Sequence, residues 1–408
     1  MTDKRNIELP SRPDMYINGE SRINHSRINH RREIKGKFSV AHLFLTDGEN
    51  AIEDYAVAQL QALCDNPVTE GCRIAIMPDV HPGVVGTIGY TQTVGTYIMP
   101  SVVGQDLGCG MLLANVKGRI KDWQRLDTVI RDKVPSGYDI RTGAHHMAES
   151  IDLEALNCYR HIQEDKALRS IGTLGGGNHF IEVDVDDEGQ AYLIIHSGSR
   201  HLGKEVTDHY LAEGHRRLAD RGISVPYELT YLDGELMQEY LDDIQIVQAF
   251  AELNRKVICQ EIVRNMKWKI QDEYSCIHNY VESEKTSYCS LPIIRKGAIS
   301  ASLGERVIIP INMRDGVILG TGLGNDEWNQ SAPHGAGRIM SRGNVKESFT
   351  VSQFRKAMKG IYTSCVGADT LDEAPFAYRG LDDIQQAIGE TVRVDKVIRP
   401  VYNFKAGR

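Results

Sequence analysis

The segment Val103-Gly104-Gln105-Asp106-Leu107-Gly108-Cys109-Gly110-Met111 places a carboxylate and a thiol three residues apart in a run with three glycines. Glycine permits tight turns and a close approach of the backbone to a ligand. A cysteine thiolate can bridge two cations, and a nearby aspartate can complete the coordination of one. The segment therefore predicts a metal-binding turn, although a buried structural cysteine in a small-residue turn would give the same pattern.

Histidines occur beside glycine, serine or asparagine in four later stretches, each at an expected turn or strand end. These stretches are Asn178-His179, His196-Ser197-Gly198-Ser199-Arg200, His278-Asn279 and His334-Gly335-Ala336-Gly337-Arg338. Neutral imidazoles and a thiolate suit divalent metals such as manganese, zinc or cobalt. Together, Asp106, Cys109, His179, His196 and His278 would be enough for two adjacent ions, as in sites that clamp a phosphoryl group. Any one of these histidines, taken singly, could instead be a hydrogen-bonded structural residue.

Composition is typical of a soluble globular protein, with 408 residues, 41% hydrophobic and 25% charged. The length allows two or three domains, but no linker divides the chain, and one large domain is expected. A net charge of −8 argues against indiscriminate coating of nucleic acid and leaves room for a local basic cleft. The eight cysteines form no CxxC pair, and no apolar leader or membrane-length run is present, so a cytoplasmic protein with reduced thiols is expected.

Hydrophobic spacing predicts helices over residues 49–64, 205–218 and 236–268, the last as one long helix or two. Buried strands are expected at 73–77, 191–195, 307–310 and 392–401, and residues 120–170 are expected to be mostly helical. The polar N-terminal region contains a tandem repeat, Ser21-Arg22-Ile23-Asn24-His25 followed by Ser26-Arg27-Ile28-Asn29-His30. We therefore predict a polar extension over residues 1–40 and a single α+β catalytic domain over 41–408.

His334 differs from the other histidines because two glycines and an alanine follow it, and then Arg338 and Arg342. A neutral histidine on an open backbone can attack phosphorus, and nearby arginines can neutralise the charge that develops. Glycine at positions 335 and 337 would let a nucleotide lie against the backbone. This stretch is a candidate for nucleotidyl transfer.

In content and order, the special stretches of this chain resemble those of the RtcB-type RNA ligases, GTP- and manganese-dependent enzymes that join RNA ends. The matching stretches are Met77-Pro78-Asp79-Val80-His81-Pro82-Gly83, Asp106-Leu107-Gly108-Cys109-Gly110, Gly172-Thr173-Leu174-Gly175-Gly176-Gly177-Asn178-His179-Phe180-Ile181-Glu182, His196-Ser197-Gly198-Ser199-Arg200, His278-Asn279-Tyr280, Arg295-Lys296-Gly297-Ala298 and His334-Gly335-Ala336-Gly337-Arg338. The chain looks like a divergent, bacterial-like member. The resemblance implies an α+β fold in which mixed and antiparallel sheets surround a central metal cleft flanked by helices.

The same resemblance implies roles for individual residues. Cys109 would bridge two Mn²⁺ ions, with His179 and His196 completing the first site and Asp106 and His278 the second. His334 would attack the α-phosphorus of GTP and form a histidine–GMP phosphoramidate. The residues that would hold the nucleotide are Asn178, Phe180, Glu182, Asn312, Ala336, Gly337 and Lys405. Those that would face RNA or phosphate are Arg200, Arg338 and Arg342.

In the family, GMP then moves to an RNA 3′-phosphate, giving an RNA-3′-pp-G end, and a 5′-hydroxyl attacks and expels GMP. A 2′,3′-cyclic phosphate is hydrolysed first. The resemblance thus implies RNA repair or tRNA splicing, with RNA as the partner and an archease-like activator as a further candidate partner.

One stretch departs from the family pattern. After Pro310, the usual Gly-Ser-Met and a later serine are replaced by Ile311-Asn312-Met313-Arg314-Asp315-Gly316. Asn312 can still hydrogen-bond, but Gly316 has no hydroxyl, so nucleotide preference is left open. Two alternatives remain: a metal-dependent phosphodiesterase or phosphatase on the same scaffold without nucleotidylation, and an RNA-binding module with structural metals. The His334 loop argues against the second alternative, because a structural metal needs no such loop.

Overall fold

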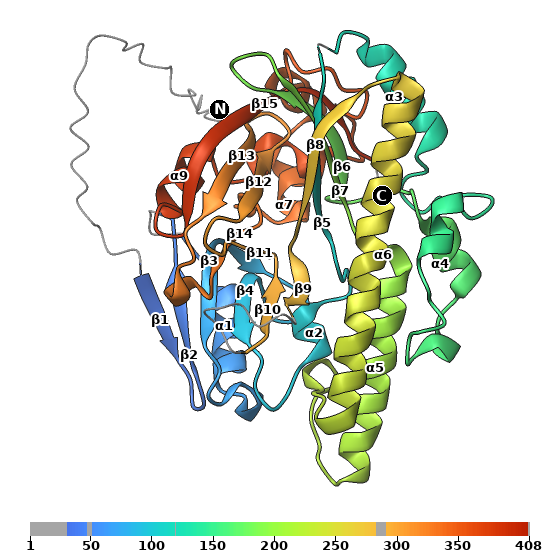
Figure 1. Ribbon diagram of the computed structural model, residues 1–408. Coiled ribbons are helices and arrows are strands. Elements are labelled where there is room, and N and C mark those ends of the chain that lie inside the picture. The colour runs from blue at the N-terminus through green and yellow to red at the C-terminus, as the bar shows by residue number, and fades with distance from the viewer. Residues whose placement is uncertain (1–30, 47–50, 119, 283–290, 407–408) are drawn as a thin grey trace, which may run out of the picture.

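The computed structural model describes residues 31–46, 51–118, 120–282 and 291–406, and its strands form three sheets (Figure 1). The six-stranded sheet runs β1 (Arg31–Lys35), β2 (Val40–Phe44), β3 (Ile74–Pro82), β4 (Thr87–Thr93), β10 (Ile293–Lys296) and β9 (Asn279–Glu282). The seven-stranded sheet runs β12 (Arg306–Asn312), β13 (Gly316–Gly322), β15 (Val392–Phe404), β6 (Phe180–Val185), β7 (Ala191–Ser197), β5 (Gly110–Val116) and β8 (Ile270–Ile277). A short ladder pairs β11 (Ala298–Ser300) with β14 (Ser331–Pro333).

Among the described strands, β2 and β3 pair in parallel and the other pairs are antiparallel. The α-helices are α1 (Asp54–Cys64), α2 (Pro100–Val103), α3 (Trp123–Lys133), α4 (Glu164–Ser170), α5 (Arg200–Asp220), α6 (Gly234–Met266), α7 (Arg342–Ser348), α8 (Val351–Ala357) and α9 (Leu381–Ala387). This combination confirms the expected α+β class with mixed and antiparallel sheets. No described helix combines the length and the apolar character needed to cross a bilayer.

The first two strands lie across the domain boundary expected at residue 40. β1 pairs with β2 in register from Arg31–Phe44 to Lys35–Val40, so the chain from residue 31 is already part of the six-stranded sheet. The tandem Ser-Arg-Ile-Asn-His repeat lies outside the described residues.

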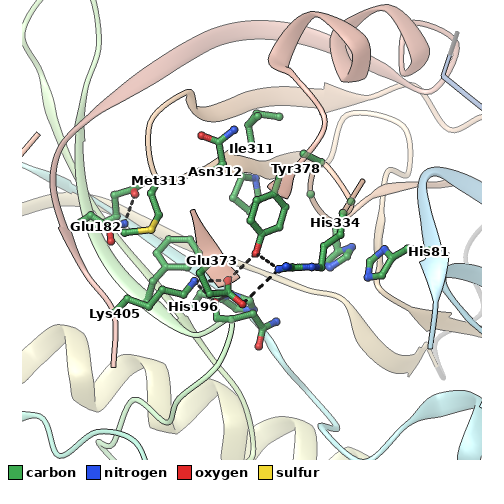
Figure 2. Close-up of a pocket in the computed structure, with 18 of the residues that line it drawn as sticks. His81, Glu182, His196, Ile311, Asn312, Met313, His334, Glu373, Tyr378 and Lys405 are labelled. Atoms are coloured by element: carbon green, nitrogen blue, oxygen red, sulfur yellow. Dashed lines mark hydrogen bonds and ion pairs between the residues drawn. The ribbon is translucent and has the colours of Figure 1, made fainter. Parts of the chain in front are cut away.

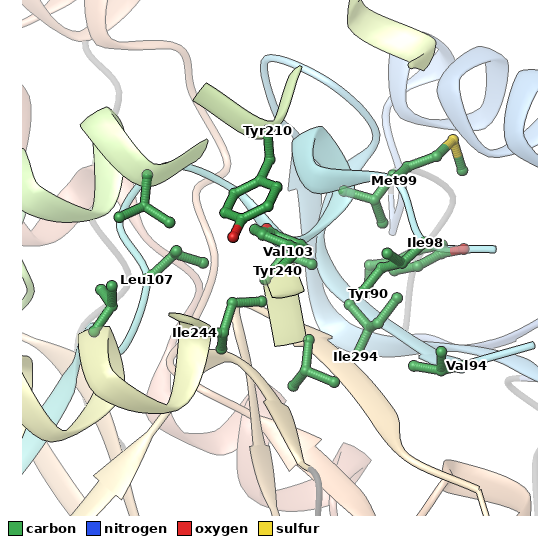
Figure 3. Close-up of a cluster of buried hydrophobic side chains, with 14 of the residues drawn as sticks. Tyr90, Val94, Ile98, Met99, Val103, Leu107, Tyr210, Tyr240, Ile244 and Ile294 are labelled. Carbon is green, nitrogen blue, oxygen red and sulfur yellow. The ribbon is translucent and has the colours of Figure 1, made fainter. Parts of the chain in front are cut away.

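The long helix α6 lies beside α5 along one side of the molecule (Figure 1). Its 33 residues span about 50 Å at 1.5 Å per residue, and the stretch expected as one helix or two is a single helix. Between these helices and the six-stranded sheet lies a buried apolar cluster that includes Tyr90, Tyr210 and Ile244 (Figure 3). Burying each such side chain contributes about 1.5–3 kcal/mol, so this cluster fixes α6 relative to the sheet.

The prediction that residues 120–170 are mostly helical is wrong. Only α3 and α4 are α-helices there, and the rest of the segment is loop and short 3-10 turns. Pro135 and Gly137 follow α3 directly and favour a turn over further helix. The Arg141 guanidinium then donates to the carbonyls of Lys133, Ile171 and Gly172, which holds this loop against the glycine-rich segment ahead of β6.

Candidate functional site

Antiparallel pairing in the seven-stranded sheet brings the expected metal ligands to one edge. β5 begins at Gly110, directly after Cys109, and Gly110 pairs with Ser197 at the end of β7 and with Ile277 at the end of β8. His196 and His278 therefore end at the same edge as Cys109. β6 begins at Phe180, opposite His196, which adds His179 to the group.

The side chains of these residues converge on the Cys109 thiol. Its Sγ lies 3.4 Å from Nε2 of His179 and 3.3 Å from Nε2 of His196. The Nε2 atom of His278 lies 3.3 Å from that of His196, and Oδ2 of Asp106 lies 3.2 Å from Nε2 of His179. All five predicted ligands therefore meet in space.

The five ligands fall into two groups, each with donor atoms within 4.8 Å of one another. One group is Cys109, His196 and His278, and the other is Asp106, Cys109 and His179. Cys109 belongs to both, as expected for a bridging thiolate. The partition of the other four differs from the one that the resemblance implied, because His179 lies with Asp106 and His278 lies with His196.

The electrostatics of the cluster fit cation binding. The Nδ1 atom of His196 lies 3.1 Å from the carbonyl oxygen of Asn178, so the proton belongs on Nδ1 and the Nε2 lone pair faces Cys109. Burial, and then the neighbouring positive charges, lower the pKa of His196 well below its usual value. Burial and then the charge of Asp106 raise the pKa of Cys109. Neutral imidazoles, a carboxylate and a thiol of this kind are the donor set that manganese, zinc or cobalt takes up, with loss of the thiol proton.

His334 lies directly after β14 and pairs with Asp79 of β3. The Asp79 carboxylate is fully buried, and its Oδ2 lies 2.6 Å from Nδ1 of His334 and 3.2 Å from the His334 backbone nitrogen. The carboxylate accepts a hydrogen bond from Nδ1–H, which keeps the proton on Nδ1 and leaves the lone pair of Nε2 free to attack. The His334 ring lies 4.8 Å from the His278 ring, so the candidate nucleophile adjoins the metal ligands.

Glycine is required at position 337 by this arrangement. Gly337 has φ +69°, and a Cβ there would lie 2.3 Å from the carbonyl oxygen of Asp79. The backbone after His334 therefore runs against the strand that carries Asp79. His81 lies two residues after Asp79 on β3 and lines the pocket next to the metal ligands. Burial lowers the pKa of His81 to about 4, so this imidazole is neutral at pH 7.

A pocket next to the metal ligands contains most of the predicted nucleotide residues (Figure 2). The predicted residues that line it are Asn178, Phe180, Glu182, His196, Asn312, His334, Ala336, Gly337, Arg338, Arg342 and Lys405. The lining residues that were not predicted are His81, Pro310, Ile311, Met313, Glu373, Tyr378 and Asn403. Gly335, which was expected to let a nucleotide lie against the backbone, also lines the pocket. Glu182 and His334 lie at opposite ends of this pocket in Figure 2.

A buried carboxylate, Glu373, organises the basic residues of the pocket. It forms ion pairs with Lys405, at 2.8 Å, and with Arg342, and it accepts a hydrogen bond from the Tyr378 hydroxyl at 2.6 Å. Burial alone would raise the pKa of Glu373, but Lys405 and Arg342 lower it to about 2. Glu373 thus stays charged and holds both cations in place. The Arg338 guanidinium lies 3.6 Å from the same carboxylate and also donates to the Asp372 carbonyl at 2.6 Å.

The opposite end of the pocket holds a pair of buried carboxyl groups on β6. Burial raises the pKa of Glu182 to about 7, and burial together with Glu182 raises the pKa of Asp184. The Asn403 amide donates to Oε2 of Glu182 at 2.5 Å. Two adjacent buried carboxyl groups cannot both ionise easily, so the pKa values of this pair lie above the usual carboxyl range.

Two predicted residues are engaged elsewhere. The Asn312 side chain accepts hydrogen bonds from the backbone nitrogens of Arg314 and Asp315 at 3.0 Å and donates to the Asp315 carboxylate at 2.8 Å, which closes the turn between β12 and β13. Arg200 does not line the pocket, because its guanidinium donates to Oγ1 of Thr173 and to the carbonyl of Gly137.

The departure at Gly316 has a structural cause. Gly316 has φ +89°, and a Cβ there would lie 2.0 Å from the carbonyl oxygen of Ile398. A serine at this position would therefore require β13 and β15 to separate.

Comparison with known proteins gives one consistent result. The family model described as tRNA-splicing ligase RtcB matches residues 59–406. The RNA-splicing ligase RtcB of Escherichia coli strain K12 is 32% identical over 368 residues, which cover 82% of this chain and 90% of that protein. The tRNA-splicing ligase RtcB of Thermococcus kodakarensis is 26% identical over 412 residues, covering 79% of this chain and 85% of that protein.

Proposed function

The chain belongs to the RtcB family of tRNA-splicing ligases, and from this premise we propose that it is an RNA ligase that uses GTP. It joins an RNA 3′-phosphate, or a 2′,3′-cyclic phosphate after hydrolysis, to a 5′-hydroxyl end. The observation that carries this proposal is the pairing of His334 with buried Asp79, beside the cluster of five metal-type ligands.

In the first step, His334 is the nucleophile. Asp79 holds the proton on Nδ1, so the Nε2 lone pair forms a bond to the α-phosphorus of GTP while the bond to pyrophosphate breaks. Arg342 and Lys405 line the same pocket and neutralise charge on the phosphate oxygens. The product is a histidine–GMP phosphoramidate on His334, and pyrophosphate leaves with the electron pair of the broken bond.

In the later steps, the GMP group makes the RNA end reactive. A 3′-phosphate oxygen of the RNA attacks the phosphoramidate phosphorus, which frees His334 and gives an RNA-3′-pp-G end. The 5′-hydroxyl of the second RNA then attacks the terminal 3′-phosphorus and expels GMP. A bare 3′-phosphate is a poor electrophile, and GMP supplies the leaving group.

The metal site fits two Mn²⁺ ions. Asp106, Cys109 and His179 would hold one ion, and Cys109, His196 and His278 would hold the other, since these are the groups whose donor atoms converge. When bound, the ions orient phosphate oxygens and stabilise their negative charge.

Glu182 and His334 both line the pocket and lie at its opposite ends in Figure 2, which supports a nucleotide with its base at Glu182 and its α-phosphate at His334. A carboxylate accepts hydrogen bonds from two adjacent N–H groups, which is the pattern that the edge of guanine offers. The Lys405 ammonium lies over the Phe180 ring, 5.5 Å from its centroid, and both side chains line the pocket together with Glu182. We assign guanine recognition to Glu182, with Phe180 and Asn178 beside it.

The proposed function is tested by incubating the protein with Mn²⁺ and α-phosphate-labelled GTP. The label is expected on the wild-type chain, labile to acid and stable to alkali, and absent from His334→Ala. His146→Ala is the matched control, since His146 is exposed and outside the pocket, and it should label normally. Failure of metal-loaded wild-type protein to label with any nucleotide, together with metal-dependent phosphate release, would instead establish the hydrolase alternative.

A further inference from the structure

Two adjacent polar residues of α6, Asn254 and Arg255, are fully buried behind the metal ligands. Oδ1 of Asn254 accepts hydrogen bonds from the backbone nitrogens of Gly172 and Thr173, at 2.7 and 3.0 Å. Its Nδ2 lies within hydrogen-bond distance of the Thr173 carbonyl, the Ser197 hydroxyl and the Gly198 carbonyl, at 3.0–3.1 Å. One amide therefore joins the glycine-rich loop to the turn after β7.

Arg255 reaches a different pair of turns. Its NH1 donates to the carbonyl of Gly108 at 2.7 Å and to the carbonyl of Ser197 at 2.9 Å. Within the described part of the chain, its Nε and NH2 atoms have no hydrogen-bond partner. A buried guanidinium is costly to desolvate. Among the described residues the Arg255 guanidinium has no ion-pair partner, so the two backbone carbonyls are its specific contacts there.

These backbone contacts are immediately next to the metal ligands. Gly108 precedes Cys109, and Ser197 follows His196. The glycine-rich loop leads to His179, and it packs so closely that a Cβ at Gly175 would lie 2.5 Å from Nδ1 of His179.

The turn that carries His278 is held by the turn that carries Cys109. The His278 backbone nitrogen donates to the carbonyl of Cys109 at 2.8 Å, so its position depends on the same turn. Gly108 also packs directly on α6, since a Cβ there would lie 2.8 Å from Cβ of Ala251 and 3.0 Å from Cα of Gln248. The helix is therefore in contact with the ligand turns along its middle section.

We propose that Asn254 and Arg255 are positioning residues that set the separation of the ligand-bearing turns and thereby the affinity and geometry of the two-metal site. This inference rests on the metal site of the proposed function. Successive residues of a helix point about 100° apart, which is why neighbours on α6 can reach different turns. Partners that orient metal ligands in this way typically change metal affinity by about 10–100-fold when they are removed.

The test compares Mn²⁺ binding by full-length wild-type protein with that of three variants. Asn254→Asp keeps the acceptor toward Gly172 and Thr173 and replaces the donor with an oxygen that faces three acceptors. Arg255→Met removes both backbone contacts, and Arg255→Lys restores a cationic donor. Asn265→Ala is the matched control, because Asn265 lies on the same helix and, within the part of the chain that the structure describes, its side chain bonds only to the Glu261 carbonyl of that helix.

Asn254→Asp and Arg255→Met are expected to bind Mn²⁺ at least tenfold more weakly than wild type, Arg255→Lys to recover part of the loss, and Asn265→Ala to match wild type. Substitution with Co²⁺ gives a second readout, since its thiolate-to-metal absorption per bound ion reports the geometry at Cys109. All proteins are assayed below their metal-free thermal midpoints, and if Arg255→Met does not fold, Asn254→Asp and Arg255→Lys carry the comparison.

Two other outcomes would overturn different claims, the first the positioning role and the second the metal site itself. Variants that lose thermal stability but bind Mn²⁺ with wild-type affinity and give the wild-type Co²⁺ spectrum would overturn the positioning role. Wild-type protein that binds neither ion would overturn the metal site of the proposed function itself.

Discussion

Oδ2 of Asp79 lies 2.6 Å from Nδ1 of His334, although the two residues are 255 positions apart in the chain. The carboxylate comes from the six-stranded sheet, and the histidine follows the short β14 strand. The pair therefore fixes the orientation and tautomer of the imidazole through tertiary contact alone. In other enzymes a buried carboxylate with this role holds the attacking side of histidine unprotonated.

Replacement Asp79→Asn should lower the rate of GMP transfer to His334 by about 100-fold or more, because the amide no longer secures the proton on Nδ1. The rate is measured in a single turnover with labelled GTP. Mn²⁺ binding should be unchanged, since Asp79 belongs to neither ligand group.

The control for this substitution is Asp243→Asn. Asp243 is also fully buried and accepts a hydrogen bond from the Tyr210 hydroxyl at 2.7 Å, but it lies in the core between α5 and α6. The Asp243→Asn variant should be less stable than wild type, but its folded form should transfer GMP to His334 at the wild-type rate. Equal loss of rate in both variants would mean that the effect of Asp79 is only structural.

The contrast between Asp79 and the metal ligands explains what sequence could predict. Cys109, His179 and His278 lie beside glycine or asparagine and His196 lies beside serine, so the pattern was visible locally, and the strand that ends near His196 could be placed from its apolar run at 191–195. Asp79 lay in a stretch that was singled out, but its partner was 255 residues away and no local pattern names it. The partition of the ligands into two groups depends on side-chain distances, which spacing along the chain does not contain.

Removal of the shared ligand should affect both ions. Cys109→Ala is expected to reduce Mn²⁺ binding from two ions to none at concentrations that saturate wild type, whereas His278→Ala should lose one ion, because His278 belongs to a single group. Metal content is measured by elemental analysis after gel filtration. Retention of one tightly bound ion by Cys109→Ala would contradict a bridging role.

Chelation of the metal should also lower the thermal midpoint. A ligand present at 100 times its dissociation constant stabilises the folded state by about 2.7 kcal/mol. The shift should be present in wild type, reduced in His278→Ala and absent in Cys109→Ala. Calorimetry with and without a chelator measures it, and a midpoint in wild type that does not respond to chelation would argue against tight binding.

Binding of GTP should depend on pH through Glu182. Burial raises the pKa of this carboxyl to about 7, so it is ionised above pH 7 and can accept hydrogen bonds from the base, and it becomes protonated as the pH falls. Affinity is expected to be about tenfold weaker at pH 6 than at pH 8. Titration calorimetry with GTP over this range measures the change.

The matched variant for this measurement is Glu182→Gln, which is uncharged at every pH. It should bind GTP weakly and without the pH dependence between 6 and 8. If GTP affinity depended on pH in Glu182→Gln as it does in wild type, the group that titrates would be another residue.

Restoring a hydroxyl at position 316 should destabilise the fold. In Gly316→Ser, the added Cβ would meet the Ile398 carbonyl at 2.0 Å in a backbone with φ +89°, and strain and overpacking together should cost about 2 kcal/mol or more. Gly304→Ser is the control, because Gly304 has φ +83° but no atom within 4 Å of its Cβ position. Urea unfolding measures the free energy of unfolding of both variants. A larger loss in Gly316→Ser than in Gly304→Ser reports the clash, and equal losses would exclude it.

The remaining pocket residues illustrate a second limit of sequence reasoning. Glu373 and Tyr378 lie in a region of short 3-10 turns without a recognisable motif, yet they hold Lys405 and Arg342 in the pocket. Lys405 itself was assigned only through resemblance. Long-range ion pairs of this kind need the register of β15 against β6, which brings Phe404 opposite Ile181.

His278 is the single residue between β8 of the seven-stranded sheet and β9 of the six-stranded sheet. The position of His278 is tightly constrained, because Ile277 on one side pairs with Gly110 of β5 and Asn279 on the other side pairs with Lys296 of β10. During biosynthesis, Asp106 and Cys109 leave the ribosome long before His278, so the nascent chain can offer only part of the donor set. Uptake of the full metal complement at the proposed site would therefore be a late event that marks a chain whose two sheets have already joined.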